Sequence, residues 1–218
     1  MSATHSCALV INGADPSVAP KSALSFVCAR LVYVLDQISA ASNTSLVIPL
    51  YFFCGQHLRA RESWESPAGV ANSLIAQLLT QCKDINLSKV SKSIKELDSS
   101  SVEDVFRLFK KILTLLPATS IVFCVLDALS FYIDDRDTGS DAKFLASELL
   151  KLAGKRVARK GPVLKLLLTA PRRLRVREED LDHGRVTVLN VPQSLPSTGG
   201  FTAEKWAVGV GKQLKKLE

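Results

Sequence analysis

The sequence predicts a single α/β domain, a three-layer sandwich in which helices cover both faces of a five-stranded parallel sheet. Five short, apolar, β-rich segments alternate with helical patterns along the chain, and this alternation is typical of parallel sheets built from right-handed crossovers. Residues 121–127 and 163–169 are almost continuously apolar, as strands buried on both faces are. A chain of 218 residues that is 47% hydrophobic can bury one such core, so residues 1–218 are predicted to form one domain.

The predicted strands are the apolar segments at residues 7–12, 46–53, 121–127, 163–169 and 185–191. The second of them contains Pro49, which has no N–H to donate to a neighbouring strand. Proline in a strand indicates an edge position or a bulge. We therefore expect residues 46–53 to lie at an edge of the sheet or to be bulged.

The helices are predicted from apolar residues spaced three or four apart and from capping residues at their ends. They cover about residues 22–38, 67–82, 105–116, 141–152 and 202–217. Ser66 before Pro67 is an N-cap followed by a first-turn proline, and Ser100 with Glu103 is a capping-box pair. In the first helix the predicted buried face is Leu24, Val27, Leu31, Val34 and Ile38. Residues 83–99 are predicted to be a connector or a weak helix.

The net charge of +7 is concentrated at the end of the chain. Residues 151–177 hold ten basic residues and no acidic one. Such a block attracts phosphate-bearing partners, and it is equally compatible with a solvated helix face and loop. No apolar run approaches the length of a membrane span, and no basic region precedes the first apolar stretch. The five dispersed cysteines suit reduced thiols, so we expect a cytoplasmic protein without a membrane span.

A damaged phosphate-binding loop follows the first predicted strand. The segment VINGADPSVAPKSALSF ends in Lys21-Ser22, where a P-loop places its phosphate-binding lysine and its Mg²⁺-binding hydroxyl. Gly13 is eight residues from Lys21 rather than six, and Pro20 replaces the second glycine, with Pro16 also in the loop. Prolines cannot offer the N–H groups with which such a loop holds phosphate. The alternative is an ordinary turn in which Ser22 caps the following helix.

Two further segments end predicted strands with polar residues, at the sheet edge where α/β proteins bind ligands. VFCVLD resembles a Walker B segment, in which the carboxylate of Asp127 would help to hold Mg²⁺. The next residue is Ala128, where hydrolysing relatives of this architecture carry a second acid. Asp134 lies further along the chain and is expected to be out of reach. The fourth strand ends at Thr169, with Arg172 just beyond it.

Four segments together resemble a known family. LVIPLYFFCGQH, ESPAGVANSLIAQLL, IVFCVLDALSFYIDD and LKLLLTAPRR look like the NTPase core of fungal STAND proteins of the NACHT-like type. The opening INGADPSVAPKSALSFVCARLV is similar to a degenerate phosphate loop in some of those proteins. The resemblance covers about residues 7–190. It implies the strand order 5-1-4-3-2 and a nucleotide-dependent switch that uses ATP or GTP with Mg²⁺.

The motifs and the resemblance together predict the residues of a site. The nucleotide-binding residues would be Gly13, Lys21, Ser22, Asp127, Thr169 and Arg172, and the Mg²⁺ ligands would be Ser22 and Asp127. No residue is predicted to be catalytic. The sequence lacks the glycine before Lys21 and an acid after Asp127, and it has no room for the effector and repeat domains of the family.

Three functions are compatible with these residues. The first is a degenerate module that acts mainly through contacts with a protein partner, binds nucleotide weakly or not at all, and hydrolyses little. The second is an active Mg²⁺-dependent NTPase that works as a signalling switch. The third is a nucleic-acid-binding protein that uses residues 151–177. That block lacks the interleaved aromatic residues on which single-stranded nucleic acids stack, so a nucleic-acid partner is the least favoured of the three.

Overall fold

The computed structural model of the chain describes residues 5–13, 22–41, 47–58, 65–154, 161–174 and 185–191. Lys21, Pro16, Pro20 and the helix expected at residues 202–217 lie outside the described residues, as does part of the basic block at 151–177. All five predicted strands and the other four predicted helices lie wholly or mostly within them.

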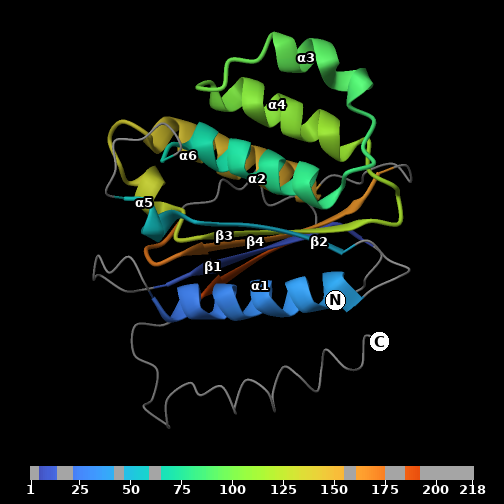
Figure 1. The fold of residues 1–218 in the computed structure, drawn as a ribbon. Helices are drawn as coiled ribbons and strands as arrows, with labels where there is room; N and C mark the ends of the chain where they lie inside the picture. Colours follow the sequence, from blue (N-terminus) through green and yellow to red (C-terminus); the bar gives the residue numbers. More distant parts are fainter. Residues whose placement is uncertain are drawn as a thin grey trace.

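A five-stranded sheet forms the centre of the molecule (Figure 1). Its strands are β1 (Cys7–Asn12), β2 (Val47–Phe53), β3 (Ile121–Asp127), β4 (Val163–Ala170) and β5 (Val186–Asn190). The order across the sheet is β2-β3-β4-β1-β5, and every neighbouring pair is parallel. This confirms the predicted order 5-1-4-3-2. The carboxyl ends of β1, β3 and β4 therefore meet at one edge of the sheet, where the predicted site residues lie.

Strand β2 forms one lateral edge of the sheet, as Pro49 predicts. Its free backbone groups are bonded by two glutamine side chains of α2 (Pro67–Gln81). Gln77 accepts a hydrogen bond from the backbone N–H of Tyr51 at 3.0 Å and donates one to its carbonyl at 2.8 Å. Gln81 donates to the carbonyl of Pro49 at 2.8 Å. The polar groups that an edge strand exposes are thus satisfied within the chain.

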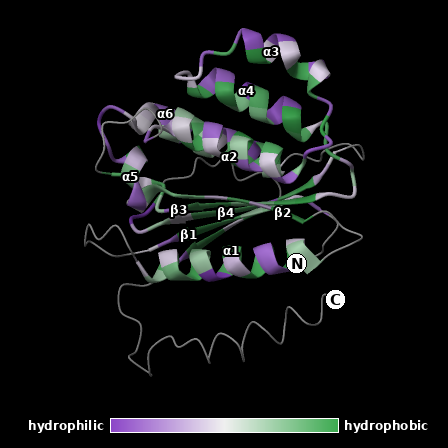
Figure 2. Cartoon of the chain, viewed as in Figure 1, coloured by the Kyte–Doolittle hydropathy of each residue, from purple (hydrophilic) through white to green (hydrophobic). Residues whose placement is uncertain are grey.

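The two faces of the sheet carry different numbers of helices (Figure 1). On one face lie α2 and α6 (Gly139–Gly154), and outside them lie α4 (Val102–Leu113), the 3-10 turn η2 (Leu87–Val90) and α3 (Ser91–Lys95). The outer helices add to the predicted sandwich because α4 packs on α2 and α6. Two short elements, η1 (Cys54–Gln56) and α5 (Ser130–Ile133), follow β2 and β3. Figure 2 shows that the sheet between these helices is mostly hydrophobic.

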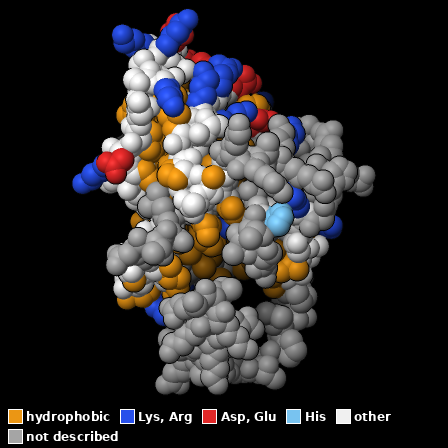
Figure 3. All heavy atoms as spheres, turned by 90° about the vertical axis from the view of Figure 1, so that its right-hand side faces the viewer, with side chains coloured by type: hydrophobic (Ala, Val, Ile, Leu, Met, Phe, Trp, Pro, Cys, Tyr) orange, Lys and Arg blue, Asp and Glu red, His pale blue; other side chains and the backbone are white. Residues whose placement is uncertain are grey.

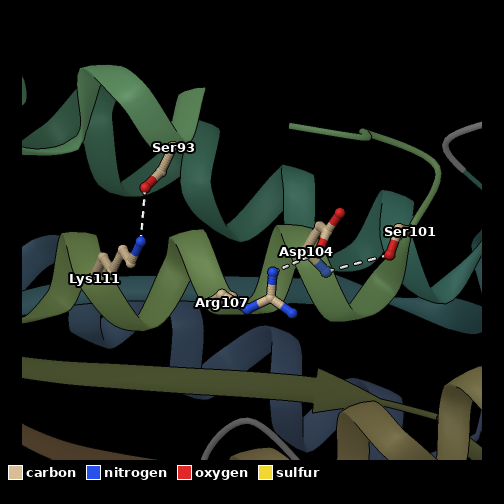
Figure 4. A network of polar contacts seen from close by, with 5 residues as sticks. All are labelled: Ser93, Ser101, Asp104, Arg107 and Lys111. Carbon is tan, nitrogen blue, oxygen red and sulfur yellow. Dashed lines mark hydrogen bonds and ion pairs between the residues drawn. The ribbon is translucent and has the colours of Figure 1, made fainter. Parts of the chain in front are cut away.

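The helix ends agree with the predicted capping residues in one case and differ in another. Ser66 caps α2 as predicted, because its hydroxyl accepts a hydrogen bond from the N–H of Gly69 at 3.0 Å. The residue that caps α4 is Ser101, not Ser100, and it accepts from the N–H of Asp104 at 3.3 Å. Figure 4 shows this cap, and it also shows Lys111 donating to Ser93 at 2.7 Å, which links α4 to α3.

The other face of the sheet carries α1 (Ala23–Ala41), which packs on β2 and β3. Its fully buried residues are Cys28, Val32 and Leu35. The predicted face is therefore wrong, because the residues predicted to be buried flank this line and Ile38 is exposed. With 19 residues and a mean hydropathy of 1.4, α1 is also long and apolar enough to cross a membrane, a property that core helices share. The helix itself was predicted, but its length and hydropathy as a candidate span were missed because only uninterrupted apolar runs were considered.

Candidate functional site

Two of the predicted site residues are bonded directly to each other where β3 and β4 end. The hydroxyl of Thr169 donates a hydrogen bond to Oδ1 of Asp127 at 2.6 Å. Each residue is only 1% exposed. A carboxylate removed from water needs such a donor because burial without one is costly. The structure therefore brings Asp127 and Thr169, both predicted to bind nucleotide, together as a buried pair.

The same hydroxyl also holds the turn that follows β3. Thr169 Oγ1 accepts a hydrogen bond from the N–H of Ala128 at 3.1 Å, and the Thr169 carbonyl accepts one from the N–H of Leu129 at 3.1 Å. Ala128 has a φ of 60°, a left-handed conformation that costs a non-glycine residue about 1–2 kcal/mol. Thr169 thus stabilises both the charge of Asp127 and the strained turn next to it.

The end of β1 is built around Asn12, which the sequence analysis did not select. Its side-chain amide donates to Oδ1 of Asn190 at 3.0 Å, and its carbonyl oxygen Oδ1 accepts from the N–H of Leu174 at 3.0 Å. Asn12 is buried. A polar residue that ends an otherwise apolar strand was the available signal. Asn12 holds together the segments that follow β4 and β5.

Gly13 lies at a close approach between two chain segments. Its N–H donates to the carbonyl of Ala170 at 2.7 Å, and a Cβ atom at this position would lie 2.7 Å from the carbonyl oxygen of Pro171. That contact is with backbone, so a larger residue would force the β1 and β4 ends apart. The need for glycine here is explained by this packing, whether or not a phosphate binds.

Ser22 adopts the capping role that the sequence analysis kept as an alternative. Its hydroxyl accepts a hydrogen bond from the N–H of Ser25 at 3.2 Å, and the Ser25 hydroxyl accepts one from the N–H of Ser22 at 3.2 Å. The two hydroxyl oxygens are also 3.2 Å apart. This reciprocal pairing satisfies two of the backbone donors at the N-terminus of α1, which would otherwise lack partners.

Arg172 forms an ion pair that the sequence analysis did not expect. Its guanidinium lies 3.4 Å from a carboxylate oxygen of Asp134, just beyond α5, and both side chains are 46% exposed. Asp134 was expected to be out of reach of the site, yet it lies beside the arginine that follows β4. Asp134 reaches Arg172 because α5 is short, so the chain after β3 stays at the carboxyl edge of the sheet.

Two buried thiols lie in the electrostatic environment of Asp127. Burial, followed by the negative charge of Asp127, raises the pKa of Cys28 to about 12, and the same two causes raise the pKa of Cys54. Cys28 Sγ lies 4.0 Å from the hydroxyl of Thr169. Both thiols therefore stay protonated at neutral pH. They pack as apolar groups and are unsuited to act as nucleophiles.

Both predicted Mg²⁺ ligands already have hydrogen-bond partners within the protein. The metal would need the carboxylate of Asp127 and the hydroxyl of Ser22, but the first is bonded to Thr169 and the second to Ser25. Within the described ranges, no cluster of three or more His, Cys, Asp or Glu residues could hold a metal ion by itself. Lys21, the predicted phosphate-binding lysine, lies outside these ranges.

Comparison with known proteins places the chain in a family. The model of the family described as "Nephrocystin 3, N-terminal" matches residues 4–170. The chain therefore belongs to the nephrocystin 3 N-terminal family. No curated protein matches the chain. Among solved structures, it is similar to the ORC1 protein of Aeropyrum pernix in complex with DNA, with 17% sequence identity and a TM-score of 0.48. That match covers 97% of this chain and 44% of the ORC1 chain.

Proposed function

We propose that this protein is a degenerate nucleotide-binding-fold module of the STAND/NACHT-like type that acts mainly through contacts with a protein partner. Nucleotide binds weakly or not at all, and hydrolysis is slight. The observation that carries the proposal is the buried hydrogen bond between Asp127 and Thr169. A Walker B carboxylate that binds Mg²⁺ has to reach the metal, whereas this residue is 1% exposed and one of its carboxylate oxygens is bonded to Thr169.

The phosphate loop supports the same proposal from the sequence. Pro16 and Pro20 each remove a backbone N–H that a phosphate cradle would use. If each charge-assisted hydrogen bond contributes roughly 1.5–3 kcal/mol, two missing donors remove about 3–6 kcal/mol of binding. That loss weakens the affinity by about two to four orders of magnitude, so a micromolar site would become near-millimolar.

Two further features support a protein-binding role in a reducing compartment such as the cytoplasm. The outer helices α3 and α4 carry the exposed Ile94, and Lys and Arg side chains gather over them at the top of Figure 3. This outer layer does not contact the sheet closely, so its surface is available to a partner without disturbing the core. All five cysteines are free thiols, which persist in a reducing environment.

Titration with fluorescent ATP and GTP, with and without Mg²⁺, tests the proposal on the full chain. We expect near-millimolar or no binding, no measurable dependence on Mg²⁺, and the same weak signal from Lys21→Ala. Lys143→Ala, on the exposed surface of α6, is the matched control for removing one positive charge. Tight, Mg²⁺-dependent binding that Lys21→Ala abolishes and Lys143→Ala does not would contradict the proposal. The alternative, an active Mg²⁺-dependent NTPase that works as a signalling switch, would then be correct.

A further inference from the structure

The face of the sheet that carries α1 is only partly covered. Helix α1 packs on β2 and β3 and reaches β4 at Leu167 and Thr169, whereas the same face of β1 and β5 has no described helix over it. Alternate residues of these strands, such as Val10, Leu168 and Val188, pack into the main core on the opposite face. Their neighbours in the strands therefore point toward the α1 side. These neighbours include Leu9, Ile11, Leu167 and Leu189.

These four side chains are apolar and incompletely buried. Leu189 is 49% exposed, and the other three are half-buried. We call Leu9, Ile11, Leu167 and Leu189 the apolar strip. A strip of this kind over three adjacent strands is unusual in an α/β sheet because both faces are normally covered.

Helix α1 borders the apolar strip with an apolar flank of its own. At 100° per residue, Val27 and Val34 lie on one side of the buried line of Cys28, Val32 and Leu35. Both valines are half-buried. Only 17% of the most apolar window of α1 is buried, although its mean hydropathy is 1.4. The flank, next to Leu31 on the helix, therefore has room for a further apolar partner.

The sequence beyond β5 contains a segment with the matching pattern. Residues 202–217 lie outside the described part of the chain, and their sequence predicts a helix with apolar residues at i, i+3, i+4, i+7, i+11 and i+14. These residues are Ala203, Trp206, Ala207, Val210, Leu214 and Leu217. They span about 100° of a helix surface, while the four lysines of the segment lie on the opposite side.

We propose that residues 202–217 form an amphipathic helix that docks its apolar side on the apolar strip, beside α1. A helix of this length extends about 24 Å, which matches a strand of six to eight residues at about 3.3 Å per residue. Its diameter of about 10 Å matches the roughly 10 Å between the first and last of three strands. The occupant is attached close by, because β5 ends at Asn190 and residues 192–201 can span up to about 33 Å.

A segment of the same chain fits the apolar strip better than a membrane surface does. The strip lies on the sheet itself, and α1 projects from that face by about a helix diameter. A flat bilayer would meet the outer side of α1 before it reached Leu9 or Ile11. A helix of the chain, by contrast, can lie in the plane of α1 and cover both at once, while its lysines remain in water.

The test uses the full chain with Trp64→Phe, so that Trp206 is the only tryptophan and reports on the segment directly. Val210→Asp places a carboxylate on the apolar side, whereas Val208→Asp, 200° away on the helix, is the matched control. Burying an unpaired carboxylate is strongly unfavourable, so Val210→Asp should lower the docking equilibrium by about two orders of magnitude or more. We expect Trp206 to be shielded from acrylamide in the starting chain and after Val208→Asp, and to be exposed after Val210→Asp.

A substitution in the apolar strip tests the sheet side of the proposed contact. Leu189→Asp should expose Trp206 to acrylamide as Val210→Asp does, and circular dichroism checks that both variants remain folded. If either variant fails to fold, the milder pair Leu189→Ala and Val210→Ala should show non-additive shifts of the urea midpoint. Equal effects of the Val208 and Val210 changes, or additive effects of the alanine pair, would overturn the proposal. Shielding of Trp206 that depends on protein concentration, or that requires anionic vesicles, would also overturn it and assign the strip to a second copy or a membrane.

Discussion

Replacing Thr169 by valine should destabilise the protein far more than its conservative character suggests. Valine keeps the shape of threonine but removes the hydroxyl that donates to Asp127 at 2.6 Å and accepts from Ala128 at 3.1 Å. A hydrogen bond to a charged group contributes about 1.5–3 kcal/mol and one between neutral groups about 0.5–1.5 kcal/mol. The expected loss is therefore about 2–4.5 kcal/mol, a large part of the roughly 5–15 kcal/mol that stabilises a typical domain.

Urea denaturation followed by circular dichroism measures this loss directly. Thr187→Val is the matched control because Thr187 is an exposed strand residue of β5, and it should change the free energy of unfolding by no more than about 0.5 kcal/mol. A second variant, Asp127→Asn, tests whether the loss of stability arises from the hydrogen bond between Thr169 and the Asp127 carboxylate. If the hydroxyl acts through the carboxylate, the effects of Thr169→Val and Asp127→Asn will not add. A Thr169→Val effect as small as that of Thr187→Val, or strictly additive effects, would refute this reasoning.

Three other measurements test separate features of the site and the core. Ala128→Gly should raise the urea midpoint, because glycine adopts the φ of 60° without the roughly 1–2 kcal/mol cost to alanine; an unchanged or lower midpoint would show that the turn is not strained. A thiol reagent should label the folded protein at only the two partly exposed cysteines, while the three fully buried thiols stay unlabelled until urea unfolds the chain. The first group is Cys7 and Cys82, and the second is Cys28, Cys54 and Cys124. Burial acts to raise the pKa of Glu148, but the hydrogen bond and charge of Lys110 outweigh it, so the pKa lies below 4.5. The stabilisation from Glu148 should therefore be present above pH 4.5 and disappear as the pH falls through its folded pKa. Comparison with Glu148→Gln across that range checks this, and a difference that persists at the lowest pH would contradict it.

The layout of the sheet could be predicted from the sequence because each strand is a local apolar segment and crossovers have one preferred hand. The buried face of α1 could not be predicted in the same way. Its apolar side is wider than the surface that meets the sheet, so spacing alone did not distinguish Val27 or Val34 from the residues actually buried, such as Cys28. The N-cap of α4 was misplaced by one residue because Ser100 and Ser101 both precede an acidic residue by three positions.

Residues of the candidate site could be predicted from the sequence only where they belong to a local motif. Asp127 and Thr169 end predicted strands, and the structure brings them together. Asn12 and Asn190 are 178 residues apart in the chain, and their hydrogen bond depends on the parallel pairing of β1 with β5. Asp134 reaches Arg172 only because the chain stays close to the sheet after β3. No local pattern encodes contacts of this kind, since they depend on the packing of distant segments.

The glutamines that bond to β2 limit how copies of this chain could polymerise. Fibres that grow by strand addition need two open edges on every subunit, one to receive a strand and one to offer it. Gln77 and Gln81 already bond the outer backbone groups of Pro49 and Tyr51, so one of the two edges is closed. In the described part of the chain, the sheet remains open only beyond β5. Pairing through that edge would stop at two copies, so the glutamines protect the folded protein against open-ended aggregation.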